Sequence, residues 1–281
     1  MIAFFADIFG YILNFLYNIF QNYGIAIIIF SILLKLLLLP ISIKQQKTTR
    51  KTAKLQSKLK EIQFKYKNDQ EKMNNETLAL YKRENMSPFS GCFSAIVQII
   101  LLLAMFYLVS SPLTYMKKVD SQVIEDYKNE IKMEQNNGKN VNYPEISIIK
   151  EKGSTDESVY INMEFLGLDL SNVPTANLSN PTVYIIPVLY LISSFISVRI
   201  TNNMINKRNE KEDENKEKTE MDAMQNVNRN MMLFMPLISV SVSMVAPLGL
   251  ALYWLVNSIL LIIEKISIDK YLDSKEEKEN A

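Results

Sequence analysis

The sequence contains no histidine and only one cysteine, Cys92. A catalytic triad, proton relay or zinc site built on histidine is therefore excluded. A lone cysteine can form neither an intrachain disulfide nor a cysteine metal cluster, and we interpret Cys92 as an ordinary buried thiol. The sequence also lacks a Walker motif, a dinucleotide fingerprint and a nucleophile elbow. We therefore expect neither an enzyme nor a protein that carries a cofactor or metal.

The sequence does contain long apolar blocks, which alternate with stretches rich in lysine, glutamate and asparagine. The chain has 281 residues, of which 48% are hydrophobic, and its net charge of +1 conceals strongly segregated charges. This mosaic is typical of a polytopic membrane protein rather than of one soluble core. We predict an all-α fold with five transmembrane helices, an N-terminal interfacial amphipathic helix and a cytoplasmic helical hairpin.

Residues 1–22 are predicted to form the interfacial helix. Polar or amphipathic side chains recur three or four residues apart, at Asp7, Tyr11, Asn14 and Asn18, whereas the other faces carry Phe, Ile and Leu. That spacing indicates a helix lying in the plane of the membrane interface. A signal peptide is not indicated, because neither a basic n-region nor a cleavage site of small residues is present. An uncleaved N-terminal span remains the alternative.

The remaining chain divides into apolar and polar segments of regular order. We predict a first span at 23–43, a basic helical hairpin at 44–88, a second span at 89–111, an outer loop at 112–181, a third span at 182–201, a cytoplasmic loop at 202–229, a fourth span at 230–246, a fifth span at 247–264 and a cytoplasmic tail at 265–281. The fourth span would be about 25 Å long, which is shorter than a typical hydrocarbon core of about 30 Å and suggests local thinning.

The orientation in the membrane follows from the distribution of lysine and arginine. Segment 44–88 has twelve Lys/Arg and five Asp/Glu, a net charge of +7, whereas segment 112–181 has seven and eleven, a net charge of −4. The positive-inside rule places 44–88 in the cytoplasm, the N-terminus outside and the C-terminus in the cytoplasm. The basic hairpin could also attract anionic lipid headgroups or ribosomal RNA. Positive-inside topology alone explains its charge at least as well.

Lys35 is the most informative single residue, because it lies inside the apolar run of the first span. An ammonium group in the hydrocarbon core costs from about 2.5 to well over 10 kcal/mol, so such residues normally face protein or a wet cavity. The predicted spans contain no Asp or Glu up to residue 263 that could neutralise it. Snorkelling to the inner interface is the alternative, but the side chain would have to climb about 12 Å.

Further polar side chains lie on the predicted spans. They are small or amide residues and one tyrosine: Ser31, Ser94, Gln98, Ser193, Ser194, Ser197, Tyr253 and Asn257. Ser94 and Gln98 share a helix face, as do Tyr253 and Asn257. Each alone is more often a helix–helix hydrogen-bond partner than a ligand contact, whereas together with a cation they favour a hydrated cavity. Tyr253 and Trp254 fit either interface anchoring or cavity lining.

Several stretches, in this order, give the chain a resemblance to a known family. They are Tyr23–Ile28 leading to Leu34–Pro40, then Lys44-Gln45, Met86–Cys92 with the Gln98 span, Phe165–Leu170, Met231–Pro236 and Pro247–Trp254. Over roughly residues 20–266 the chain resembles the YidC/Oxa/Alb membrane-protein insertases. No single stretch is specific, but the ordered set on five spans with a basic hairpin after the first is specific.

This resemblance implies a membrane-protein insertase or chaperone in the bacterial cell membrane, with no small-molecule substrate. The family's positive residue, usually arginine, belongs to the first span and lies in a hydrophilic groove, where it attracts hydrophilic, often acidic, client segments. Lys35 would take that role, with Gln98, Ser197, Tyr253 and Trp254 bordering the groove. The expected partners are nascent membrane proteins and the lipid bilayer, with the Sec translocon and the ribosome as further candidates.

Three features depart from the family pattern. The cation is lysine, which keeps the charge but loses the planar donor fork of arginine. The N-terminus lacks the lipoprotein signal common among Gram-positive relatives, and the outer loop is long. A solute channel or transporter remains an alternative, although it normally requires a path open on both sides and internal repeats. A membrane scaffold whose hairpin docks partners is the third possibility.

Overall fold

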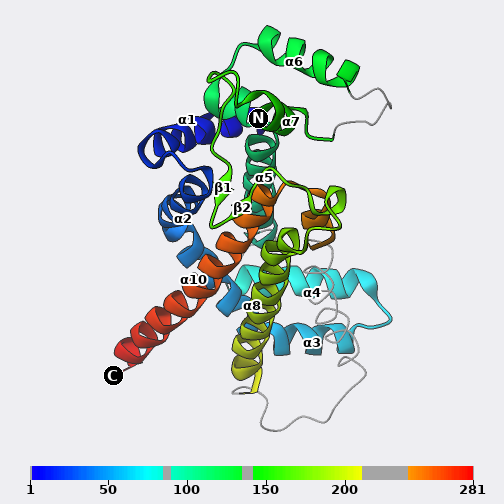
Figure 1. Cartoon of the computed structure of the whole chain (residues 1–281). Helices are drawn as coiled ribbons and strands as arrows, with labels where there is room; N and C mark the ends of the chain where they lie inside the picture. The colour runs from blue at the N-terminus through cyan, green and yellow to red at the C-terminus, as the bar shows by residue number, and fades with distance from the viewer. Residues whose placement is uncertain (1, 85–89, 135–141, 211–239, 281) are drawn as a thin grey trace. The chain divides into compact units, whose positions relative to one another are not determined.

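The computed structural model describes residues 2–84, 90–134, 142–210 and 240–280 (Figure 1). The fold is almost entirely helical. The chain forms two compact units. The first unit comprises Met1–Leu36, Gln98–Ser194 and Leu237–Leu260, and the second comprises Leu37–Val97, Phe195–Pro236 and Leu261–Ala281.

Four described helices are long and apolar enough to cross a membrane: α1 (Ile2–Phe20), α2 (Tyr23–Lys54), α8 (Ile185–Glu210) and α10 (Leu248–Asn280). A fifth helix, α5 (Ser90–Ser110), contains a shorter apolar stretch. These helices make the chain an all-α polytopic membrane protein, as the sequence predicted. Of the predicted fourth span, 230–239 lie outside the described residues, and 240–245 are helical.

Helix α1 buries one face and exposes another that is also largely apolar. Its buried side chains include Phe9, Leu13 and Leu16, and its exposed ones include Phe4 and Phe15. A helix that is apolar on both faces fits either a span or an interfacial helix packed on protein. The interfacial position therefore stays a prediction.

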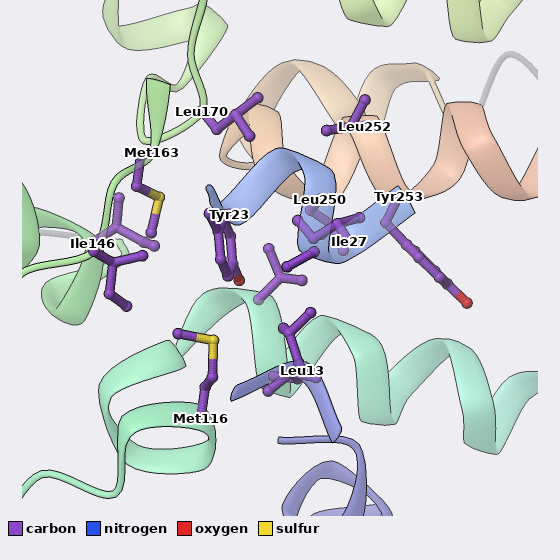
Figure 2. Packing of buried hydrophobic residues seen from close by; sticks show 14 of the residues in the cluster. Leu13, Tyr23, Ile27, Met116, Ile146, Met163, Leu170, Leu250, Leu252 and Tyr253 are labelled. Atoms are coloured by element: carbon purple, nitrogen blue, oxygen red, sulfur yellow. The ribbon is translucent and has the colours of Figure 1, made fainter. Parts of the chain in front are cut away.

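The first unit has one continuous apolar core. It combines buried residues of α1, α2, α5 and α10 with residues of the segment between α5 and α8. Figure 2 shows Tyr23 and Ile27 of α2 beside Leu250 and Leu252 of α10, with Leu13 of α1 nearby. Within a membrane, such packing exchanges contacts with lipid rather than with water, so close van der Waals contact holds the helices together. The starts of α2 and α10 are therefore held in a common packing environment.

The segment predicted as a long polar loop contains regular structure of its own. It forms a π-helical turn η1 (Leu113–Lys117), helices α6 (Ser121–Glu134) and α7 (Pro144–Lys152), strands β1 (Glu164–Phe165) and β2 (Leu168–Asp169), and short helices η2 (Pro174–Ala176) and η3 (Pro181–Tyr184). Helices α6 and α7 contact each other. An Asn-Asn-Gly stretch at 136–138, whose sequence predicts a turn, lies outside the described residues. The sequence pattern did not predict these helices, because α7 is short and α6 buries only Ile124 and Ile131 in an otherwise polar stretch.

The β1–β2 hairpin connects the starts of α2 and α10. The backbone N–H of Tyr23 donates to the carbonyl of Asn162 (3.0 Å), and the N–H of Gly249 donates to the carbonyl of Leu170 (3.0 Å). The side chain of Asn22 also donates to the carbonyl of Glu164 (2.7 Å). The two backbone bonds satisfy donors that the first turn of a helix leaves without an intrahelical partner.

The second unit contains the charged end of α2, the paired helices α3 (Gln56–Lys65) and α4 (Gln70–Arg83), and the ends of α8 and α10. Asp69 caps α4 by accepting a hydrogen bond from the Lys72 N–H (3.0 Å). Helix α2 continues through Pro40 to Lys54, so the first part of segment 44–88 belongs to the same helix as the first span. Segment 265–281, predicted as a polar tail, is helical as far as Asn280.

Candidate functional site

Helix α2 places Ser31 and Lys35 one turn apart on the same face in the first unit. Ser31 is buried, and its hydroxyl donates to the carbonyl of Ile27 (2.7 Å). Lys35 is half-buried, although its neighbours at 32–34 and 36–39 are all isoleucine or leucine. Lys35 therefore lies on the side of α2 that Ser31 occupies, within the apolar part of the helix.

Helix α10 contributes Tyr253, Trp254 and Asn257 to the same unit. Tyr253 and Trp254 are buried and Asn257 is half-buried. In Figure 2 the ring of Tyr253 extends away from the other labelled side chains. The indole Nε1 of Trp254 is buried and has no hydrogen-bond partner within the described part of the chain. A buried donor of this kind is normally satisfied by water or by a bound group.

Helix α8 adds an aromatic residue that sequence reasoning did not identify. The ring of Tyr190 lies against the indole of Trp254, with 6.0 Å between ring centroids and an interplanar angle of 35°. One turn later, Ser193 and Ser194 are buried, and the Ser193 hydroxyl donates to the Tyr190 carbonyl (2.9 Å). Nothing in the sequence pattern pairs Tyr190 with Trp254, because the two residues are far apart in the chain.

Three other predicted site residues are Ser197, Ser94 and Gln98. Ser197 is buried but belongs to the second unit. The side chains of Ser94 and Gln98 lie outside what the structure describes, although both residues are in α5. Of the predicted residues whose side chains the structure describes, the first unit contains Ser31, Lys35, Ser193, Ser194, Tyr253, Trp254 and Asn257.

In the second unit, sequence reasoning missed a buried arginine. From the sequence alone Arg50 is only one basic residue of segment 44–88, yet its side chain is 5% exposed and lies against acidic residues of α10. It contacts the carboxylates of Asp269 (2.5 Å), Asp273 (2.7 Å) and Glu276 (3.7 Å). The three acids recur along one face of α10, which is the sequence signal that could have revealed them.

The first unit also buries an acidic residue outside the spans. Glu145 of α7 is 4% exposed, and its carboxylate accepts hydrogen bonds from the Thr114 N–H (3.0 Å) and hydroxyl (2.6 Å). Burial raises the pKa of Glu145 above its usual range, and the hydrogen bonds from Thr114 oppose part of that change. Glu145 thereby ties α7 to the start of η1.

The predicted set in the first unit supplies a cation, hydroxyls, an amide and aromatic rings. Such groups can bind an acidic or otherwise polar segment through charge-assisted hydrogen bonds, which suits recognition rather than bond breaking. Within the described residues no group of three or more His, Cys, Asp or Glu is placed to hold a metal ion.

Comparison with known proteins agrees with this architecture. The chain is 28% identical over 262 residues to a protein of Geotalea uraniireducens named "Membrane protein insertase YidC", an alignment that covers 93% of the chain and 37% of that relative. A protein of the same name from Syntrophus aciditrophicus is 48% identical over 87 residues, covering 31% of the chain and 16% of the relative. The chain thus spans less than two-fifths of either relative's length.

A third relative has a length closer to that of this chain. The protein of Fusobacterium nucleatum with the same name is 27% identical over 249 residues, which is 89% of the chain and 87% of the relative. The family described as "60Kd inner membrane protein" matches residues 15–276, which include each of the four candidate membrane-spanning helices in part or whole. The chain therefore belongs to the 60Kd inner membrane protein family.

Proposed function

We propose that this protein inserts nascent membrane proteins into the lipid bilayer, with Lys35 as the cation that attracts their hydrophilic segments. The proposal draws on the relatives, which are named insertases, and on the first unit's own chemistry. The proposed site is a hydrated groove bordered by Ser31, Lys35, Tyr253, Trp254 and Asn257. The activity would be transfer of a segment between environments, with no covalent step.

The observation that carries this proposal is the position of Lys35. A half-buried ammonium in the apolar part of α2 is costly unless its surroundings are hydrated or polar. A cation held there lowers the cost of bringing a carboxylate below the headgroups, because opposite charges attract more strongly at low dielectric than in water. The apolar part of the client could then move into lipid while its acidic segment stays at the groove.

The proposed orientation places the N-terminus outside and the C-terminus in the cytoplasm. Its support is the net charge of +7 on segment 44–88 against −4 on segment 112–181. With this orientation the groove would receive clients from the cytoplasm. The ribosome and the Sec translocon are then candidate partners in the pathway, and tests with and without each would assign them.

Complementation of bacteria depleted of their own insertase tests the function. The client is a small single-span protein with an acidic outer segment. Its insertion is measured by how far the membrane protects it from added protease. Wild type and Lys35→Arg should restore insertion, Lys35→Ala should reduce it by about tenfold if the charge contact is worth about 1.4 kcal/mol, and Lys35→Glu should abolish it.

Lys47→Glu is the matched control, because Lys47 is exposed on the same helix and the substitution makes the same change in charge. It should insert the client as wild type does, at equal protein levels. Full activity of Lys35→Glu would refute the role of the cation while leaving the insertase assignment standing. Failure of wild type to restore any client, with the protein present in the membrane, would refute the assignment.

A further inference from the structure

The hairpin of β1 and β2 has an unusual residue at its turn. Glu164 pairs with Asp169 and Phe165 pairs with Leu168, which leaves Leu166 and Gly167 as the two turn residues. Both have positive φ, +51° for Leu166 and +77° for Gly167. Turns of this geometry favour Asn-Gly or Asp-Gly, because a bulky apolar side chain is strained at positive φ.

Leu166 is also 85% exposed. Packing within the described part of the protein therefore does little to offset the backbone strain at this residue. An isolated exposed leucine is common on protein surfaces. A leucine that is both strained and exposed at a turn, where asparagine would fit and hydrate better, indicates an apolar environment around that side chain. The turn residue itself thus points to a partner outside the chain.

Polarity changes along the hairpin from its base to its tip. At the base, the Asp169 carboxylate accepts from the Ser171 N–H (2.9 Å) and lies 3.8 Å from the Lys150 ammonium. The paired residues nearer the tip, Phe165 and Leu168, are apolar. A hairpin with a charged base and an apolar tip fits a boundary between water and hydrocarbon.

The hairpin also lies at the level where α2 enters its apolar run. The Phe165 ring packs so closely on Gly24 that a Cβ there would lie 2.5 Å from the ring. The apolar run starts at Gly24, and the next residue, Ile25, is 37% exposed. Figure 1 shows the hairpin running beside the first turns of α2. The exposed tip therefore lies next to the exposed apolar surface of a membrane-spanning helix.

We propose that the tip of this hairpin is a lipid anchor, with Leu166 inserted among the acyl chains of the leaflet in which α2 begins. Because the same segment bonds to the backbone of Tyr23 and of Gly249, the anchor sets the depth at which α2 and α10 enter the membrane. This inference goes beyond the proposed function, since it requires only that the protein is embedded in a bilayer.

Site-specific fluorescence in proteoliposomes tests the anchor. The full chain carries Cys92→Ser and a single new cysteine, Leu166→Cys, labelled with an environment-sensitive nitrobenzoxadiazole. Ile25→Cys is the lipid-facing reference, and Met133→Cys on the polar helix α6, where the native side chain is 78% exposed, is the aqueous reference. Each label is measured with phosphatidylcholine carrying a nitroxide on its acyl chain and with aqueous iodide.

The label at residue 166 should resemble that at residue 25, with blue-shifted emission, strong quenching by the nitroxide lipid and at least about threefold weaker quenching by iodide than at residue 133. An aqueous emission spectrum with strong iodide quenching would overturn the proposal. Protection from both quenchers would also overturn it, because the tip would then contact protein, such as a second copy of this chain.

A second variant tests the depth-setting role and does not depend on labelling the turn. Leu166→Asn suits the positive φ, so the hairpin should stay folded while losing its apolar tip. The label at Ile25→Cys should then shift toward the aqueous spectrum, whereas Met133→Asn should leave it unchanged. An unchanged Ile25→Cys spectrum in the Leu166→Asn protein would refute the depth-setting role.

Discussion

Arg50 donates through one guanidinium nitrogen to both the backbone carbonyl and the carboxylate of Asp269, at 2.6 and 2.5 Å. The residues are 219 positions apart, so this contact joins the charged end of α2 to the last part of α10 within the second unit. A planar guanidinium can serve several acceptors at once, which lysine cannot do with the same geometry. These contacts attach the last part of α10 to the end of α2, and this part of the chain is an ordered helix.

Loss of this ion pair should destabilise the second unit. Arg50→Ala would remove the buried cation that Asp269 and Asp273 share, but the two carboxylates are 18% and 58% exposed, so the cost should lie between about 1 kcal/mol for an exposed pair and about 3 kcal/mol for a buried one. For a chain of this size, that corresponds to a thermal midpoint about 2–12 °C lower. Thermal unfolding of the purified protein in detergent measures it.

The matched control for Arg50 is an exposed ion pair of the same unit. Lys58 lies 3.0 Å from Glu84, and both side chains are well exposed. Lys58→Ala should therefore change stability by less than about 1 kcal/mol. Equal midpoints for the Arg50→Ala and Lys58→Ala proteins would show that Arg50 contributes no more than a surface charge.

Gly10 should not tolerate a larger residue. A Cβ at this position of α1 would lie 1.9 Å from the backbone carbonyl oxygen of Tyr115 in η1, and backbone cannot move aside as a side chain can. Gly10→Ala should destabilise the protein by about 1–3 kcal/mol through overpacking. Limited proteolysis between α1 and α2, together with the thermal midpoint, would report separation of α1 from η1.

Gly249→Ala provides the comparison, since its added Cβ would find its nearest neighbour, Tyr23 Cε1, at 3.4 Å. That distance is an ordinary contact, so the substitution should be nearly neutral. If Gly10→Ala were as stable as Gly249→Ala, the close approach of α1 to η1 would be wrong.

Glu145 should give stability a specific pH dependence. Its pKa is raised by burial, so the folded state binds a proton more tightly than the unfolded state does. The resulting stabilisation is fully present below the unfolded pKa of about 4.3 and is lost as pH rises through the folded value. The midpoint of wild type minus that of Glu145→Gln should therefore fall as pH rises from about 4 toward neutrality.

Glu151→Gln, on an exposed position of the same helix, controls for the general titration of acidic residues. Its midpoint difference from wild type should vary little over the same range. A difference for Glu145→Gln that rises with pH would mean that Thr114 and its neighbours favour the carboxylate more than burial disfavours it.

The proposed insertase predicts a reciprocal charge preference. If Lys35 attracts acidic client segments, replacing the client's Asp residues by Lys should slow insertion by wild type, and Lys35→Glu should prefer the lysine client. Insertion into proteoliposomes by the purified variants, with both clients competing in one reaction, measures the preference. The same client ranking for both variants would exclude charge matching at this residue, whatever the total activity.

Periodicity and hydropathy were sufficient to predict the fold class. Apolar runs of about 20 residues dictate membrane-crossing helices because lipid cannot satisfy backbone polar groups. Hydropathy also identifies Lys35, because a charged residue within an apolar run can be recognised without knowing which residues contact it. Segment 112–181 was harder to predict, because α6 and α7 are short and polar and depend on contacts with each other and with η1.

The sequence by itself therefore determined that the chain spans a membrane as a set of helices and carries a cation within an apolar run, because these properties depend on local composition. Only the tertiary structure showed that Arg50 meets Asp269, that Tyr190 lies on Trp254, and that Phe165 packs on Gly24. Each of these pairs joins residues distant in the chain, and no local pattern encodes which partner the packing will choose.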